Sequence, residues 1–116
     1  EDRFIKQPWD DIEKDIKHLV FNEGITSIGK YAFAHYTSLE TITMSSVETI
    51  NHHAFYDCPV LKKLTTSNSL KVIGREAFRD CKKFTYIYYS GTQEEWNNVS
   101  IDDHNDEMDK VKGLVS

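Results

Sequence analysis

Two cysteines, Cys58 and Cys81, are the first residues of the sequence that could support nucleophilic, redox or metal chemistry. They occupy the same position in two similar segments, so we expect them on neighbouring strands about 4.8 Å apart, which leaves a disulfide geometrically possible. Buried cysteines also behave as small apolar residues, and no activating base stands beside either thiol in the sequence. We therefore favour two free structural thiols.

Adjacent histidines form the second candidate. His52 and His53 follow one another, and neighbouring side chains diverge in direction, which suits neither a zinc pair nor a His-Glu-x-x-His motif. The equivalent positions of the related segments hold surface-type residues, so we expect both histidines to face solvent.

The remaining motifs are weak. Asp103, Asn105, Glu107 and Asp109 alternate like calcium ligands, but the EF-hand glycine and the closing glutamate are missing, which favours a solvated acidic tail. A glycosylation sequon at 98–100 is short enough to arise by chance. No nucleophile elbow, P-loop, dinucleotide-binding or Cys-x-x-Cys motif occurs. The sequence therefore predicts no catalytic residue, no metal and no cofactor.

Composition and charge narrow the class of partner. The chain has 116 residues, 39% hydrophobic and 28% charged, which is typical of one small globular domain. Its net charge of -5 argues against a nucleic-acid partner, although the segment 62–83 carries half of the basic residues. No apolar run is long enough to cross a bilayer, and the charged opening Glu1, Asp2 and Arg3 is not a signal peptide.

The sequence contains an internal repeat, and the stacking of its copies must position the candidate residues described above. The segments 25–44, 47–66 and 70–89 align with steps of 22 and 23 residues, and a partial copy comes before them. The aligned apolar columns are Ile28, Ile50 and Ile73; Ala32, Ala54 and Ala77; Phe33, Phe55 and Phe78; Leu39, Leu61 and Phe84; the partial copy contributes Ile16, Leu19 and Phe21. One copy cannot close a core, so the copies must stack.

The spacing within each copy predicts its elements. The Leu-x-x-Leu-x-Leu-like part puts alternate side chains of a short strand on one face, and the Ala-Phe part suits a tight helical turn. Stacked copies then form a parallel β ladder of about four to five strands with short helical turns. We therefore predict an α/β repeat solenoid that is right-handed and capped at both ends.

Outward side chains of the ladder are the best functional candidate. One column is His18, Thr41, Lys63 and Tyr86, and the next is Val20, Thr43, Thr65 and Tyr88. Tyrosines with neighbouring Thr and Lys suit a binding face, because rigid rings with polar tips lose little entropy on contact. The alternative is that Tyr and Thr simply favour strands. The proposed binding residues are His18, Thr41, Thr43, Lys63, Thr65, Tyr86 and Tyr88.

Both ends carry signals for caps. The segment 11–17 predicts a short helix or turn that leads into a strand at 18–21, with Trp9 over the first coil. Thr92 and Glu95 form a capping box that should start a short helix carrying Trp96, and Val99 and Ile101 should add a strand to the ladder. Residues 102–116 are expected to be an acidic tail from which Val111, Leu114 and Val115 could still dock.

The pattern resembles a known family. Ile73, Gly74, Ala77, Phe78, Cys81, Phe84 and Ile87 match the motif of BspA-like (Treponema-type) leucine-rich repeats most fully, and the resemblance covers roughly 8–101. Tyr36, Asn51 and Thr66 depart from it, which suggests imperfect local packing. The resemblance implies a secreted or cell-surface protein, and adhesion to host or matrix proteins.

These observations give the sequence-based hypothesis. The chain divides into a cap and first strand at 1–22, three leucine-rich repeats at 23–89, and a C-terminal cap with a short helix and acidic tail at 90–116. We predict a non-catalytic binding module for a protein or a glycan, without nucleic-acid binding or membrane insertion. The alternative is a structural spacer or assembly domain that displays a neighbouring domain.

Overall fold

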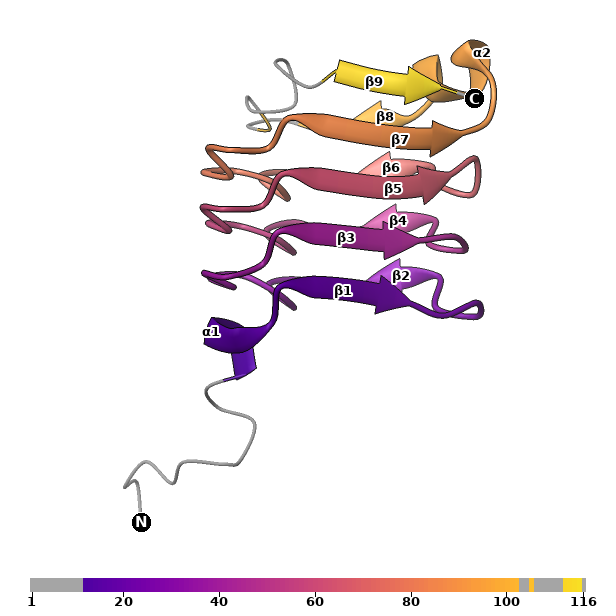
Figure 1. Cartoon of the computed structure of the whole chain (residues 1–116). Coiled ribbons are helices and arrows are strands. Elements are labelled where there is room, and N and C mark those ends of the chain that lie inside the picture. Colours follow the sequence, from indigo (N-terminus) through magenta and orange to yellow (C-terminus); the bar gives the residue numbers. More distant parts are fainter. Residues whose placement is uncertain (1–11, 103–104, 106–111, 116) are drawn as a thin grey trace.

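A parallel sheet runs along the front of the molecule in the computed structural model, which describes residues 12–102, 105 and 112–115 (Figure 1). Its strands follow the order β1-β3-β5-β7-β9, and every neighbouring pair is parallel. They are β1 His18–Phe21, β3 Thr41–Met44, β5 Lys63–Ser67, β7 Tyr86–Ser90 and β9 Lys112–Val115. The predicted parallel ladder is confirmed.

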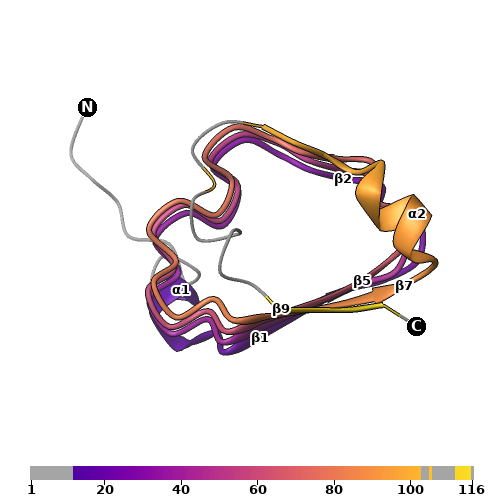
Figure 2. The same ribbon diagram turned by 90° about the horizontal axis from the view of Figure 1, so that it is seen from above.

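A second parallel sheet, which the sequence did not predict, lies behind the first (Figure 1). Its order is β2-β4-β6-β8, and each strand has two residues. The strands are β2 Ser27–Ile28, β4 Thr49–Ile50, β6 Val72–Ile73 and β8 Ser100–Ile101. Seen from above, successive coils lie over one another as a closed outline with a strand on each long side (Figure 2). The fold is therefore a parallel β solenoid.

Turns replace the helical turns that were expected in each repeat. Among the described residues the helices are α1 Ile12–Asp15 and α2 Gln93–Asn97, both outside the repeats, so the α/β and helical-turn part of the prediction is not confirmed. Instead, the backbone N–H of Phe33 donates to Ala54 in the next coil, and that of Phe55 donates to Ala77, both at 2.8 Å. Because these backbone groups find their hydrogen-bond partners in the next coil, the turns do not need the hydrogen bonds of a helix. The turns contain six non-glycine residues with positive φ in two columns: Tyr31, His53 and Glu76; His35, Asp57 and Asp80.

The core lies between the two sheets and the turns. Phe55 and Phe78 are fully buried and their rings stack at 5.4 Å, while Phe33 stacks on Phe55 at 5.5 Å but is only partly covered. Ala54 and Ala77 are likewise buried, whereas Ala32 is exposed. Burial therefore increases from the first coil inwards, as expected when each coil is covered by its neighbours.

Cys58 and Cys81 are both buried thiols outside a disulfide, as predicted. Each sulfur donates to a backbone carbonyl of the preceding coil: Cys58 to Phe33 at 3.3 Å and Cys81 to Phe55 at 3.1 Å. The two thiols therefore help to tie the turns together.

The C-terminal end differs in part from the prediction. Thr92 caps α2 with the expected capping box, and Trp96 packs on Tyr89 with ring centroids 5.2 Å apart. A backbone hydrogen bond from Thr92 lowers the pKa of the Glu95 carboxyl. The strand expected around Val99 and Ile101 exists as β8, but it pairs with β6 in the second sheet, and β9 extends the front sheet instead.

Asn105 shows that the expected solvated tail is partly wrong. Its side chain is 5% exposed; it accepts from the backbone N–H of Phe78 and donates to the carbonyls of Gly74 and Asp102. The side-chain amide thus supplies hydrogen-bond partners to backbone groups of the last coil, because no further coil follows to supply them.

The three departures from the repeat motif have defined surroundings. The Asn51 side chain donates to Ser27 Oγ and to the Ile28 carbonyl, and Thr66 is 3% exposed within the core. Tyr36 packs edge-on against Phe33 at 5.2 Å. The Asn51 and Tyr36 side chains therefore make specific contacts, and the imperfect local packing expected at the three positions stays a prediction. The expected position of Trp9 over the first coil lies outside the described residues.

Candidate functional site on the outward face of the front sheet

The pleat of the front sheet turns alternate side chains outwards. In β7 the pattern is regular: Ile87 and Tyr89 are buried, and Tyr86 and Tyr88 are exposed. Strand register places all seven predicted residues, with Val20, in two adjacent columns: His18, Thr41, Lys63 and Tyr86; Val20, Thr43, Thr65 and Tyr88. The residues therefore share one face.

Three side chains at the C-terminal end of this face form a small aromatic and cationic cluster. Tyr86 is 43% exposed and Tyr88 is 38% exposed, and their ring centroids lie 6.3 Å apart at 27°. The ammonium of Lys63 lies 5.5 Å from the centre of the Tyr88 ring, within range of a cation–π contact. We call Lys63, Tyr86 and Tyr88 the tyrosine cluster. The two rings and the ammonium group therefore lie side by side on the outward face.

The N-terminal end of the face is different. His18 Nδ1 lies 2.7 Å from Thr41 Oγ1, so these two polar groups satisfy each other. Val20 is 69% exposed beside them, with Thr43 also exposed and Thr65 half-buried. These residues give a flat continuation of the tyrosine cluster rather than a second cluster.

A hollow at the beginning of the strands was missed by sequence reasoning. It has a volume of about 330 Å³, and its lining residues come from successive coils: Lys17, Thr37, Ser38, Glu40, Val60, Lys62 and Lys83. The concentration of basic residues at 62–83 was visible in the sequence. The stacking of the coils brings Lys62 and Lys83 close to Lys17, and the alignment of the repeats could have revealed this proximity.

On the turn side, the structure corrects the expectation that His52 and His53 both face solvent. Both rings are half-buried; the His53 side chain is 19% exposed, stacks on Tyr31 at 4.6 Å, and its Nε2 lies 2.8 Å from Glu76 Oε1. Their Nδ1 atoms lie 2.9 Å apart, so one of the two nitrogens carries the shared proton. The two rings converge because His53 has a positive φ, which reorients its side chain.

Glu76 is the centre of that turn-side group. Its carboxylate accepts from Arg79 at 3.0 Å and lies 3.3 Å from Arg75 Nε. The hydrogen bond from Arg79 is the largest cause that lowers the pKa of Glu76; burial opposes it and His53 adds to it. Since each strong partner of this carboxylate belongs to the chain itself, the group serves to lock neighbouring turns.

Metal-ligating side chains do not gather at the candidate chemical sites within the residues that the structure describes. In the described part of the chain, His, Cys, Asp and Glu side chains form no group of three that could hold a metal ion. The calcium pattern falls largely outside the described residues, and Asn105 is occupied by backbone groups. The described helices include none with the length and apolarity to cross a membrane.

Comparison with known proteins supports the repeat assignment. The family model for the BspA type leucine rich repeat region, with 6 copies, matches residues 12–105. Among solved structures, a leucine rich cell surface protein from Faecalibacterium prausnitzii is 31% identical, with a TM-score of 0.66. The match covers 72% of this chain and 22% of that chain, so this chain spans less than a quarter of the solved protein's length. No curated protein matches the sequence.

Proposed function

This chain belongs to the BspA type leucine-rich-repeat family, and from that premise we propose that it is a non-catalytic protein-binding module of a secreted or cell-surface protein. The binding surface is the outward face of the front sheet, and the partner is a host or matrix protein to which the parent protein adheres. The solved relative is itself a cell surface protein, which supports the location.

The observation that carries this proposal is the tyrosine cluster. Tyrosines are enriched at sites that dominate binding energy, because they offer a large apolar ring with a polar tip. Here Tyr86 and Tyr88 are exposed although neighbouring strand residues are buried, and Lys63 holds one ring through its ammonium. The flat polar columns beside the cluster would exclude water around it, as the less critical rim of an interface does.

The test is a binding panel of extracellular matrix proteins presented to the purified chain. We expect at least one protein to be retained, and Tyr86→Ala/Tyr88→Ala to weaken its binding by roughly 10- to 100-fold, since truncating each dominant side chain costs about 1–2 kcal/mol. Tyr31→Ala is the matched control, because Tyr31 is 53% exposed but lies among the turns. Retained affinity in the double variant, or equal loss in the control, would show that the partner uses another face.

A structural spacer is the second candidate. The observation in its favour is that the solved relative is several times longer than the matched region, so the repeat block can be one unit among others. A spacer predicts that no matrix protein is retained by the folded chain, and that deleting the block from the parent protein changes the reach of a neighbouring domain. A partner lost on mutation of the tyrosine cluster excludes this role as the sole one.

A further inference from the structure

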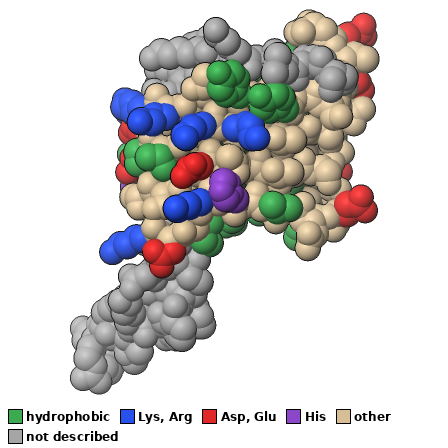
Figure 3. All heavy atoms as spheres, in the orientation of Figure 1, with side chains coloured by type: hydrophobic (Ala, Val, Ile, Leu, Met, Phe, Trp, Pro, Cys, Tyr) green, Lys and Arg blue, Asp and Glu red, His purple; other side chains and the backbone are tan. Residues whose placement is uncertain are grey.

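The basic side chains are not spread evenly, although the chain as a whole is acidic. Lys and Arg side chains gather over the half of the front sheet where the strands begin, with a few acidic side chains among them, and further acidic side chains stand at the edge where the strands end (Figure 3). The basic side chains near the strand beginnings are Lys14, Lys17, Lys62, Lys63, Lys82 and Lys83. A net charge of -5 therefore conceals a locally cationic surface.

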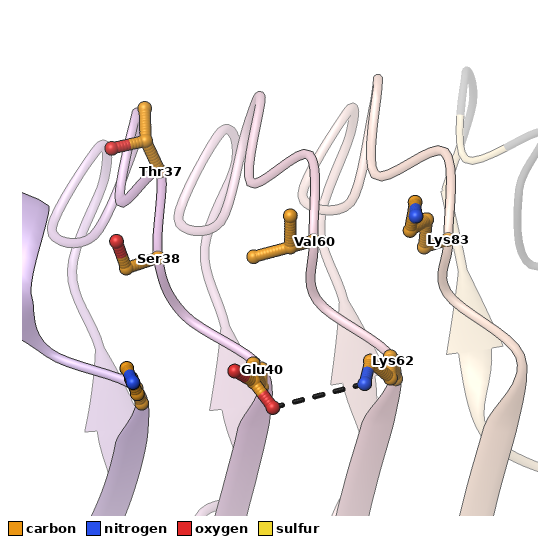
Figure 4. A pocket seen from close by; sticks show the side chains of 7 residues that line it. Thr37, Ser38, Glu40, Val60, Lys62 and Lys83 are labelled. Carbon is orange, nitrogen blue, oxygen red and sulfur yellow. Dashed lines mark ion pairs between the residues drawn. The ribbon is translucent and has the colours of Figure 1, made fainter.

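The hollow at the strand beginnings lies within this surface. Figure 4 shows Thr37, Ser38, Val60 and Lys83 along its wall, and Lys62 pointing toward Glu40. That ion pair has a separation of 3.7 Å, and the Lys62 side chain remains 57% exposed. In the described part of the chain no carboxylate lies within ion-pair distance of Lys17 or Lys83. Three ammonium groups thus face one hollow with a single carboxylate among them.

The repeat sets the spacing of these cations. The backbone N–H of Glu40 donates to Lys17, and that of Lys62 donates to Glu40, so the three residues hold equivalent places on successive coils. Neighbouring parallel strands are about 4.8 Å apart, which puts the backbones of Lys17 and Lys62 about 10 Å apart. On the next coil the equivalent place is held by Thr85, whose backbone N–H donates to Lys62, and Lys83 lies two residues before it. The coils therefore bring Lys17, Lys62 and Lys83 to one hollow, with Glu40 between the first two, and positive charges spread over several coils suit a polymer whose negative charges also repeat.

The lining residues distinguish among anionic polymers. All three cations are lysines, which bind anionic groups as point charges, without the bidentate geometry that arginine offers to carboxylates and phosphates. Val60 is the one apolar side chain in the lining, so a peptide would find no pocket for an apolar anchor. The lining also holds no aromatic ring on which nucleic-acid bases could stack. Thr37 and Ser38 add hydroxyl groups, although Ser38 already donates to the Lys14 carbonyl.

We propose that this hollow binds a sulfated polysaccharide through Lys17, Lys62 and Lys83. Sulfate groups contact the three ammonium groups, and sugar hydroxyls contact the hydroxyl-lined wall. The site is separate from the tyrosine cluster and does not depend on the proposed protein partner. It gives the module a second ligand, of the kind that coats many cell surfaces and matrices.

The probe is a fluorescent heparin-derived oligosaccharide, compared with its chemically desulfated form of equal length. We expect the sulfated form to bind and the desulfated form to fail. By the counterion-release relation for polyanions, three contacts predict a roughly 20- to 40-fold loss of affinity between about 50 and 200 mM salt. Polyglutamate and single-stranded DNA of similar length should bind at least tenfold more weakly.

Three variants test the residues. Lys17→Gln/Lys62→Gln/Lys83→Gln should lose at least tenfold in affinity, with an unchanged circular dichroism spectrum. Lys30→Gln/Lys71→Gln/Arg75→Gln removes the same charge from exposed residues outside the hollow lining and should bind like the unaltered chain. Tyr86→Ala/Tyr88→Ala should also keep its affinity for the sulfated probe, so this proposal and the proposed function fail separately.

Four results would overturn the proposal. One is the absence of binding by the unaltered chain at low salt. Another is an equal loss in the two charge-matched triple variants, which would indicate general electrostatics. Equal affinity for polyglutamate would point to an acidic protein segment instead, and equal affinity for DNA would show no selectivity among polyanions.

Discussion

Replacing Phe55 by alanine tests how the solenoid is held together. Phe55 is fully buried in the middle of the phenylalanine stack, with Phe33 at 5.5 Å on one side and Phe78 at 5.4 Å on the other. Removing a buried phenylalanine ring costs about 3–5 kcal/mol, because the transfer energy and the cavity both count. The free energy of unfolding of a domain this size is about 5–15 kcal/mol, so Phe55→Ala should remove a large share of it.

Equilibrium urea unfolding, followed by circular dichroism, measures this loss. With a slope of about 2 kcal/mol per molar urea, the midpoint should fall by roughly 2 M. Phe33→Ala is the matched control: its ring belongs to the first coil and is already partly exposed, so its loss should be clearly smaller. A Phe55→Ala loss below about 1 kcal/mol, or equal losses in the two variants, would refute the idea that burial by neighbouring coils stabilises the stack.

Three further predictions concern single residues. A methyl group at Gly74 would lie 2.8–2.9 Å from backbone atoms of the preceding coil, so Gly74→Ala should cost about 1–3 kcal/mol, whereas Gly29→Ala, with no atom within 4 Å, should be nearly neutral; urea midpoints compare them. Asn105→Leu should cost about 1–3 kcal/mol, because it leaves the buried Phe78 N–H unpaired, and a thermal melt with less than a 4 °C drop would contradict this. The lowered pKa of Glu76 means that its ionised form stabilises the fold above its ordinary pKa near 4.5, and that this stability is lost as the pH falls through the lower, folded pKa. Glu76→Gln should therefore flatten the decline of the urea midpoint below about pH 4.5, and an unchanged decline would argue against this role.

The sequence predicted those elements of the fold that local patterns of apolar and capping residues specify. The strand expected at 18–21 is β1 His18–Phe21, and the capping box of Thr92 and Glu95 begins α2 as expected. Both depend on local patterns, which side-chain alternation and cap chemistry determine directly.

The second sheet could not be predicted in the same way. Each of its strands has two residues, which is too short for any alternation to be visible. The placement of Ser100–Ile101 in that sheet, and of Lys112–Val115 in the front sheet, follows from how the last coil closes. Such long-range pairing leaves no local pattern in the sequence.

The sequence predicted which residues of the candidate site share the outward face, but it did not predict which of their side chains are in contact. Strand alternation was enough to place Lys63, Tyr86 and Tyr88 on one face. The cation–π contact and the hollow around Lys17 depend on side chains from different coils, and the burial of His53 depends on a positive φ. A sequence pattern reports which face a residue occupies, whereas these features need the three-dimensional arrangement.

Chemical-shift mapping of the isotope-labelled chain with the matrix protein that it retains is the most direct test of the central claim. The account predicts that the largest changes fall on the backbone amides of β5 and β7, around Lys63, Tyr86 and Tyr88, and weaken toward β1. Changes confined to the turns around Tyr31 and His53 would contradict the account, because the partner would then use the turn side of the solenoid instead of the outward face of the front sheet.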